Sequence, residues 1–339
     1  MDKKKNLAKS ILITLAFPLV MWGIMELLVR AKTGHAMIVS MLDIKTIVRN
    51  AGISAMIAYA LAFNLLSGRF DLSLGAQRLA GTIIGGLVAL HFGFSGIGLL
   101  ICSLLFGLLF GFLTGLMFVT FRVPPMVLGI GMGLIWEVVP YIVSDGKGLN
   151  VFGNQGVAIL IETPFIIGIT VVVGAVVTFI MSKTKFGYEL KAIQGSQLIA
   201  QNSGINIFKN TVLCYTFAGG LVCMAGAIAT AYSTNLSATL GLTSSAVVAA
   251  NMFPMIVGQY IGRWSNSGVG IIVAAITIRI FSYGLTLMEF SEANASMFNM
   301  LFFVGFLIFL ANEDIFRKRK AEKARVAEAL SYKTDNGIA

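Results

Sequence analysis

Long apolar runs, separated by short polar segments, dominate this chain. Each run is close to the length of about 20 residues at which an α-helix crosses a lipid bilayer. The ten runs cover approximately residues 11–29, 47–66, 76–91, 96–121, 125–143, 164–182, 210–231, 243–261, 268–288 and 297–311. A transmembrane β-barrel is excluded, because its strands alternate polar and apolar residues over about ten positions. The pattern predicts an all-α polytopic membrane protein with about ten transmembrane helices.

Composition and charge placement extend this prediction. Only 12% of the 339 residues are charged, whereas a soluble domain carries about 25%. The net charge of +10 does not indicate a nucleic-acid partner, because the basic residues lie between and beyond the apolar runs, as topology signals do. With ten spans both termini share one side, and that side would hold 19 Lys and Arg against five opposite. The positive-inside rule therefore predicts cytoplasmic N- and C-termini.

We expect two regions. Residues 1–311 would form a transmembrane domain that includes a cytoplasmic loop at 182–209, and residues 312–339 a basic cytoplasmic tail. A weak internal repeat is also visible, because RFDLSLGAQ (69–77) resembles NLSATLGLT (235–243). These segments follow the second and seventh spans, which run in opposite directions, so the match predicts an inverted repeat. A chance match over nine residues is the alternative.

Polar side chains inside the apolar runs are candidates for a solute pathway. A charge within a span costs about 3 kcal/mol on the insertion scale, so Glu137 and Arg279 either line a pathway or form a buried pair. The amides within or beside spans either join helices or contact a polar solute. The complete candidate pathway set is Asn64, Asp71, Ser73, Gln77, Glu137, Asn251, Gln259 and Arg279. For Asp71 and Ser73, the alternative is a cap on the helix that follows.

The sequence carries no recognisable catalytic motif. HExxH, GxSxG, CxxC and the phosphate loop GxxxxGK[ST] do not occur, and the two histidines are isolated near span ends. The three cysteines lie inside apolar runs, where small buried side chains are expected. We therefore expect no enzymatic activity, no metal site and no cofactor. If ATP drives this protein, the ATPase must be on another chain.

The segment 182–209 is the longest internal polar segment. We expect a short helix at about Tyr188–Gln194, a break at Gly195 and a second helix that ends at Gly204. Helices this short are not stable alone in water, so the loop is interpreted as a docking surface with an apolar knob and a charge pair. A solvated connector is the alternative. The expected coupling residues are Gly187, Tyr188, Glu189, Leu190, Lys191, Ala192, Ile193, Gly195, Ser203 and Gly204.

Two segments resemble the ribose, xylose and galactose type of ABC transporter permease. The loop follows that family's pattern T-x-x-G-x-x-x-x-A-x-G-x-N-x-x-A-A-x-x-S-G-I at Thr184, Gly187, Ala192, Gly195, Ala200, Ser203, Gly204 and Ile205. Residues 67–75, SGRFDLSLG, are similar to the family's early motif S/T-G-G-I-D-L-S-V-G. The family's acidic stretch after the seventh span is absent from residues 240–250, and its glycine turn is rewritten at 258–268. These departures leave the solute open.

The resemblance implies the membrane-spanning permease subunit of a bacterial ABC importer for a monosaccharide or similar small polar solute. It also implies a second permease copy or paralogue, an ABC ATPase subunit on the cytoplasmic loops and an extracytoplasmic solute-binding protein. The location would be the bacterial cytoplasmic (inner) membrane. The alternative is an ATP-independent secondary transporter or channel, which would use ionisable residues at the midplane. A scaffold without a transport role is disfavoured by the number of polar side chains within the spans.

Overall fold

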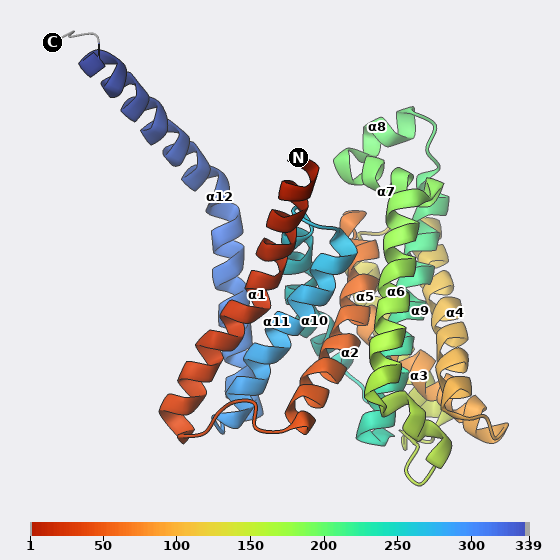
Figure 1. Cartoon of the computed structure of the whole chain (residues 1–339). Helices are drawn as coiled ribbons and strands as arrows, with labels where there is room; N and C mark the ends of the chain where they lie inside the picture. Colours follow the sequence, from red (N-terminus) through yellow and green to blue (C-terminus); the bar gives the residue numbers. More distant parts are fainter. Residues whose placement is uncertain (1, 336–339) are drawn as a thin grey trace. The chain divides into compact units, whose positions relative to one another are not determined.

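Ten long helices follow the ten apolar runs in the computed structural model, which describes the backbone of residues 2–335 (Figure 1). Side chains are described for this range except residues 2–10, 13, 292, 314, 316–321 and 323–335. The long helices are α1 (Asp2–Thr33), α2 (Met41–Leu66), α3 (Leu74–His91), α4 (Gly96–Phe121), α5 (Pro125–Val143), α6 (Thr163–Lys183), α9 (Ile207–Ser233), α10 (Ala246–Ile261), α11 (Ser267–Leu287) and α12 (Glu292–Asp335). The short elements are β1 (Leu149–Asn150), η1 (Gln155–Ile161), α7 (Lys185–Gly195), α8 (Gln197–Asn202), β2 (Asn235–Leu236) and η2 (Thr243–Ser245).

The predicted all-α polytopic architecture is confirmed. Among the described residues, nine helices are long and apolar enough to cross a membrane, and the tenth long helix, α3, does not meet that criterion. Gln77 and Arg78 near its start lower its mean hydropathy. Most α3 residues are buried against other helices, so α3 is an interior helix of the bundle.

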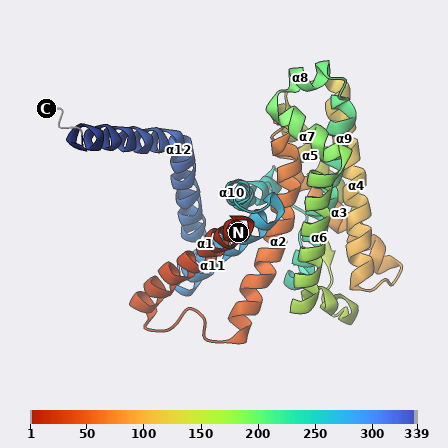
Figure 2. The same ribbon diagram turned by 45° about the horizontal axis from the view of Figure 1, so that its top comes forward.

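Helices α2 and α9 form the centre of the bundle and run in opposite directions (Figures 1 and 2). Helices α3 and α4 pack on each other and on α9, while α10 and α11 pack on each other and on α2. The triplet α2–α3–α4 thus makes the same set of contacts as the triplet α9–α10–α11. This packing is the arrangement expected of an inverted repeat.

A seam of glycines brings α4 and α9 into backbone contact. A Cβ atom added at Gly107 would lie 2.5 Å from the carbonyl oxygen of Gly219, and one at Gly111 would lie 2.3 Å from that of Tyr215. Real Cβ atoms do not approach other atoms this closely. These regularly spaced glycines therefore allow close helix packing within this chain, as small residues do in many membrane helices.

The chain divides into two compact units, the first ending at Met288 and the second beginning at Glu289. The second unit contains α12, which continues through residue 311, where the sequence predicts the start of the tail. The basic side chains of the predicted tail 312–339 lie outside the described side chains, and residues 336–339 lie outside the described residues.

Candidate functional site: a buried polar network, a cavity and an exposed two-helix arm

Four of the predicted pathway residues form one hydrogen-bonded network at the break between α2 and α3. Asp71 Oδ1 accepts from the Ser73 backbone N–H at 2.8 Å and from the Ser73 hydroxyl at 2.6 Å. Asp71 Oδ2 accepts from Asn64 Nδ2 at 3.3 Å and from Gln77 Nε2 at 3.5 Å, and Gln77 Nε2 also donates to Ser73 Oγ at 2.8 Å. All four residues are at most 2% exposed.

This geometry fits the helix-cap alternative only in part. The Asp71 carboxyl group accepts from the N–H of Ser73, the residue that precedes α3, and no described side chain caps the free N–H groups of the first turn of α3. A nearby carboxylate is still favoured by the partial positive charge of a helix N-terminus. Two acceptors of the network, Asn64 Oδ1 and Gln77 Oε1, are buried without a hydrogen-bond partner.

Glu137 fixes the segment that leads into α10. Its Oε2 accepts from the Leu242 N–H at 2.7 Å and its Oε1 accepts from the Ser244 N–H at 2.9 Å. Leu242 has a positive φ of 63°, and Ser244 presses on the start of α3, where a Cβ at Gly75 would lie 2.1 Å from the Ser244 carbonyl oxygen. Glu137 therefore ties η2 between α3 and α5.

The expected alternative of a Glu137–Arg279 pair is wrong. The Glu137 carboxyl group is fully buried and bonded to backbone N–H groups instead. Arg279 on α11 has a buried Nε atom without a hydrogen-bond partner. Backbone N–H groups thus bind the Glu137 carboxyl group in place of the expected Arg279 side chain.

The two remaining amides join neighbouring segments. Asn251 Oδ1 on α10 accepts from the Ser54 hydroxyl on α2 at 2.6 Å, and Asn251 Nδ2 donates to the Val247 carbonyl at 2.8 Å. Gln259 Oε1 accepts from the Ser267 hydroxyl at 3.0 Å across the turn between α10 and α11. The structure therefore gives these amides the helix-joining contacts that were one of their two expected roles.

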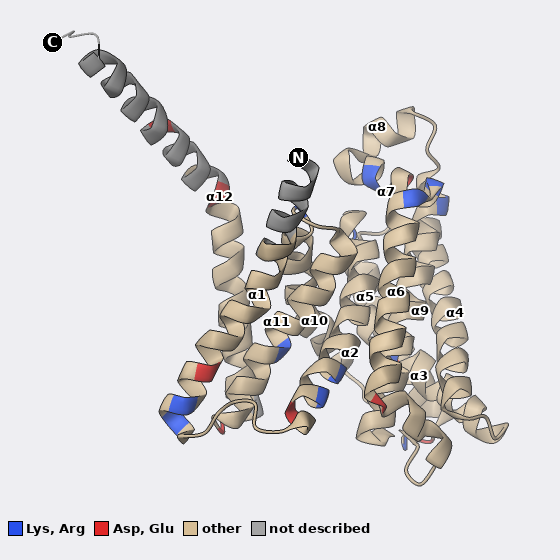
Figure 3. Cartoon of the chain, in the orientation of Figure 1, with Lys and Arg blue, Asp and Glu red and all other residues tan. Residues whose placement is uncertain are grey.

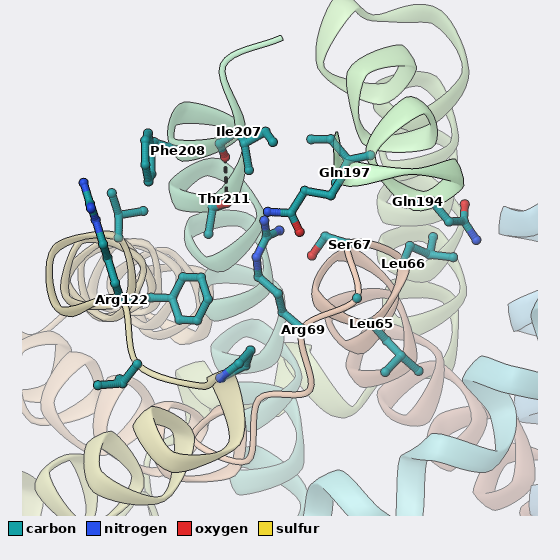
Figure 4. Close-up of a pocket in the computed structure, with 16 residues that line it drawn as sticks. Leu65, Leu66, Ser67, Arg69, Arg122, Gln194, Gln197, Ile207, Phe208 and Thr211 are labelled. Carbon is teal, nitrogen blue, oxygen red and sulfur yellow. Dashed lines mark hydrogen bonds between the residues drawn. The ribbon is translucent and has the colours of Figure 1, made fainter. Parts of the chain in front are cut away.

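A cavity of about 640 Å³ opens where the ends of α2 and α4 meet α7, α8 and α9 (Figure 4). Its polar lining includes Arg69, Arg122, Gln194 and Gln197, and the described lining residues include no Asp or Glu. Arg69 is 4% exposed, its Nη1 is buried without a hydrogen-bond partner, and its guanidinium lies 5.6 Å from the centre of the Phe118 ring.

Sequence reasoning missed Arg69, which it counted only as a topology signal. One signal was present, because Arg69 stands at the third position of SGRFDLSLG, where the family motif has glycine.

The other site in this region is the arm formed by α7 and α8. Its two short helices with a break at residue 196 confirm the expected loop structure, although α7 begins three residues earlier than predicted.

The apolar knob expected on the arm comprises Tyr188, Leu190 and Ile193, and only Tyr188 is exposed. Leu190 and Ile193 are buried, the first in the main core and the second against Ala200 and Ile207. They position the arm rather than present a surface. Gly187 is also inward, since a Cβ there would lie 2.4 Å from the Ile180 carbonyl oxygen.

The exposed apolar side chains of the arm are Tyr188, which was expected in the knob, and Leu198 and Ile199 on α8. Lys191, Ala192, Gly195, Ser203 and Gly204 are also exposed. Glu189 and Lys191 are the charge pair expected to face a partner, and Glu189 also lies 3.8 Å from Lys185 within α7. Figure 3 shows basic residues at this end of α6 and α7 and few charges along the middle of the long helices.

Within the part of the chain that the structure describes, no group of three or more His, Cys, Asp or Glu side chains could hold a metal ion. The described functional geometry consists of buried polar links between helices, the cavity of Figure 4 and the exposed arm.

The fold defines the class of protein. The chain matches a solved structure titled "An inward-facing conformation of a putative metal-chelate type ABC transporter", with a TM-score of 0.53 and 14% sequence identity. The match covers 91% of this chain and 99% of the other. This protein is therefore a multi-pass membrane protein with an ABC transporter permease fold.

The chain belongs to the permease family described as "Branched-chain amino acid transport system / permease component", whose model matches residues 44–310. It is 27% identical over 286 residues to the Ribose import permease protein RbsC of Bacillus subtilis, covering 80% of this chain and 83% of the relative. It is 23% identical to the Fructose import permease protein FrcC of Rhizobium meliloti, covering 71% and 70%. The predicted resemblance to sugar-type ABC permeases is thereby confirmed.

Proposed function

We propose that this chain is the membrane-spanning permease subunit of a bacterial ABC importer, and that it translocates a monosaccharide or a similar small polar solute. The observation that carries the proposal is the exposed α7–α8 arm on a bundle with an ABC permease fold. The names of the ribose and fructose import permeases support a sugar as the solute class. The chain itself performs no covalent chemistry.

The proposal includes three protein partners. An ABC ATPase subunit docks on the arm, an extracytoplasmic solute-binding protein delivers the solute to the opposite face, and a second permease copy or paralogue completes the pathway. The arm then lies on the cytoplasmic side of the bacterial inner membrane, as do both termini. The basic residues Lys183, Lys185, Lys191 and Lys209 near the arm support this orientation.

The buried polar residues shape the pathway in this proposal. The Asp71 network holds the segment 69–77 against α2, and Glu137 on α5 holds the end of its repeat-related counterpart, 235–243. The unpartnered acceptors Asn64 Oδ1 and Gln77 Oε1 are groups that a hydroxyl of a polar solute would satisfy in another conformation. Alternating access then requires two packings of these segments, biased by ATP binding on the partner.

The arm is tested by the double variant Ala192→Glu with Gly195→Glu. Both residues are exposed, and a Cβ at Gly195 would have no atom within 4 Å, so the bundle accommodates the change. We expect normal membrane insertion with loss of ATPase co-purification and of solute-dependent ATP hydrolysis. A double variant that assembles and hydrolyses ATP as the wild type does would refute docking on this arm.

A matched pair of single variants separates docking from general damage. Leu198 on α8 is 69% exposed and Val39, between α1 and α2, is 77% exposed. Leu198→Glu should weaken ATPase assembly, whereas Val39→Glu should leave it unchanged, because Val39 is far from the arm along the helices. Equal loss in both variants would contradict the proposed location.

A further inference from the structure

The cavity beside the arm holds a cation without a counterion. Arg69 lies at its base, almost fully buried, and makes no ion pair with any described residue. Its neighbour in sequence, Asp71, directs its carboxyl oxygens to Asn64, Ser73 and Gln77 instead. A buried charge requires a partner of opposite sign or strong hydrogen bonds. The cavity is thus incomplete without an anionic ligand.

Space and access are both present. Figure 4 shows the Arg69 side chain extending into the cavity toward Gln197, with Thr211 on the neighbouring helix. A volume of about 640 Å³ is in the range of small-molecule sites. Arg122, which is exposed at the end of α4, supplies a second guanidinium at the rim.

The lining selects the chemistry of the ligand. Guanidinium groups bind phosphate through two parallel hydrogen bonds, and two arginines match its multiple oxygens. The polar side chains Ser67, Gln194 and Gln197 add neutral donors for ester oxygens or hydroxyl groups. The remaining wall is apolar and includes Phe118, Val119, Ile193 and Phe208. The cavity therefore suits a phosphate joined to a group with apolar surface.

We propose that this cavity binds a phosphate ester, with Arg69 holding the phosphate at the base and Arg122 contacting it at the rim. The ester is carried either by an anionic membrane phospholipid or by a free phosphorylated metabolite. Basic pockets at the cytoplasmic ends of transmembrane helices are suited to lipid headgroups. The site borders the segment 69–77, which the proposed function assigns to the pathway, and binding there does not require the ATPase.

Two arms of one experiment distinguish the sources. The purified chain is placed in nanodiscs of phosphatidylcholine with or without phosphatidylglycerol, and retained lipid is counted by native mass spectrometry. In the second arm, inorganic phosphate or glycerol 3-phosphate is added to the phosphatidylcholine nanodiscs and the melting temperature is recorded. A lipid site retains phosphatidylglycerol, whereas a metabolite site retains no phosphatidylglycerol and raises the melting temperature with glycerol 3-phosphate or inorganic phosphate.

Variants assign the effect to the cavity. Arg69→Met removes the charge and keeps an apolar stem, and we expect retention or ligand affinity to fall at least about tenfold. Arg122→Gln, at an exposed position, should reduce it about two- to fivefold. Lys209→Gln is the control, because it makes the same charge change at an exposed residue near the arm that does not line the cavity.

Each outcome decides the proposal. Binding that falls in Arg69→Met and Arg122→Gln but persists in Lys209→Gln supports it. If Arg69→Met does not fold, the contrast between Arg122→Gln and Lys209→Gln carries the test. Absence of both lipid retention and a melting shift in the wild type, or equal loss in Arg122→Gln and Lys209→Gln, overturns it.

Discussion

Replacing Glu137 by Gln tests whether a buried carboxylate holds the entry to α10. In the wild type, its two oxygens accept N–H groups from Leu242 and Ser244 at 2.7 Å and 2.9 Å. A glutamine keeps one acceptor and turns its NH₂ group toward the other N–H. That N–H group is then buried without a partner, because the whole Glu137 side chain lies inside the bundle.

The expected cost follows from these two bonds. An unsatisfied buried donor costs about 1–3 kcal/mol, and the remaining bond weakens by about 1 kcal/mol when its acceptor becomes neutral. Removing a buried charge relieves part of its desolvation cost. The net expectation is a loss of about 2 kcal/mol in the free energy of unfolding, equal to a factor of about 30 in the folding equilibrium constant.

The assay is unfolding of the purified chain in mixed micelles by titration with denaturing detergent, followed by circular dichroism. Limited proteolysis of residues 234–245 gives a local readout, since this segment should become more accessible. Glu189→Gln is the matched control, because Glu189 pairs at 3.8 Å with a Lys185 side chain that is 91% exposed, and such pairs contribute about 0–1 kcal/mol. Identical unfolding and cleavage in the two variants would refute the proposed anchoring by Glu137.

Four further variants, one of them a control, address other parts of the bundle. Gly111→Ala should lower the free energy of unfolding by about 1–3 kcal/mol, because the new Cβ must displace the Tyr215 backbone. The control Gly168→Ala has open space around its Cβ and should be neutral or stabilising by up to about 1 kcal/mol. Unfolding in detergent compares the two variants, and equal effects would contradict close backbone packing between α4 and α9. Asp71→Asn should insert normally yet reduce solute uptake in cells, because one of its oxygens becomes a donor facing Ser73 or Gln77; uptake at the wild-type rate and affinity would exclude an essential charge. Arg279→Leu should unfold at an equal or higher temperature than the wild type, since the Nε atom of Arg279 lacks a hydrogen-bond partner. The variant should also retain ATP-dependent solute uptake in proteoliposomes. Loss of uptake with intact ATP hydrolysis would instead favour a role of Arg279 in ion coupling.

The fold could be predicted because each span needs its own run of about 20 apolar residues. Even α3 was found, although Gln77 and Arg78 lower its hydropathy. The extents of α1 and α12 could not be predicted, because their helices continue into polar flanks. There, no change in hydropathy marks where the backbone hydrogen bonding ends.

In the candidate site, contacts between residues close in sequence could be predicted, whereas contacts between distant residues could not. Asp71 and Ser73 could be placed together at one helix break because they are close in sequence, whereas their hydrogen bonds with Asn64 and Gln77 were not predicted. The contact of Glu137 with residues 242–244 was out of reach, because its donors are backbone N–H groups more than a hundred positions away. Backbone donors leave no signature in the side-chain sequence, so an arginine was considered as the partner instead. The arm was recognised by its motif, but the inward orientation of Leu190 and Ile193 depends on packing against the bundle.

The glycine seam between α4 and α9 has a mechanical consequence. It joins a helix of the first repeat to the central helix of the second, with backbone atoms directly in contact. At Gly107 and Gly111 its shortest contacts are made by backbone carbonyl groups, which have no rotamers to change, so the joint resists sliding and opening. The two repeats are therefore not expected to separate as two rigid halves. Helix α4 of the first repeat and helix α9 of the second together form a fixed frame. Movement during transport must be concentrated in elements that lie outside this frame, above all α5 and the segment leading into α10, where a single carboxylate provides the link.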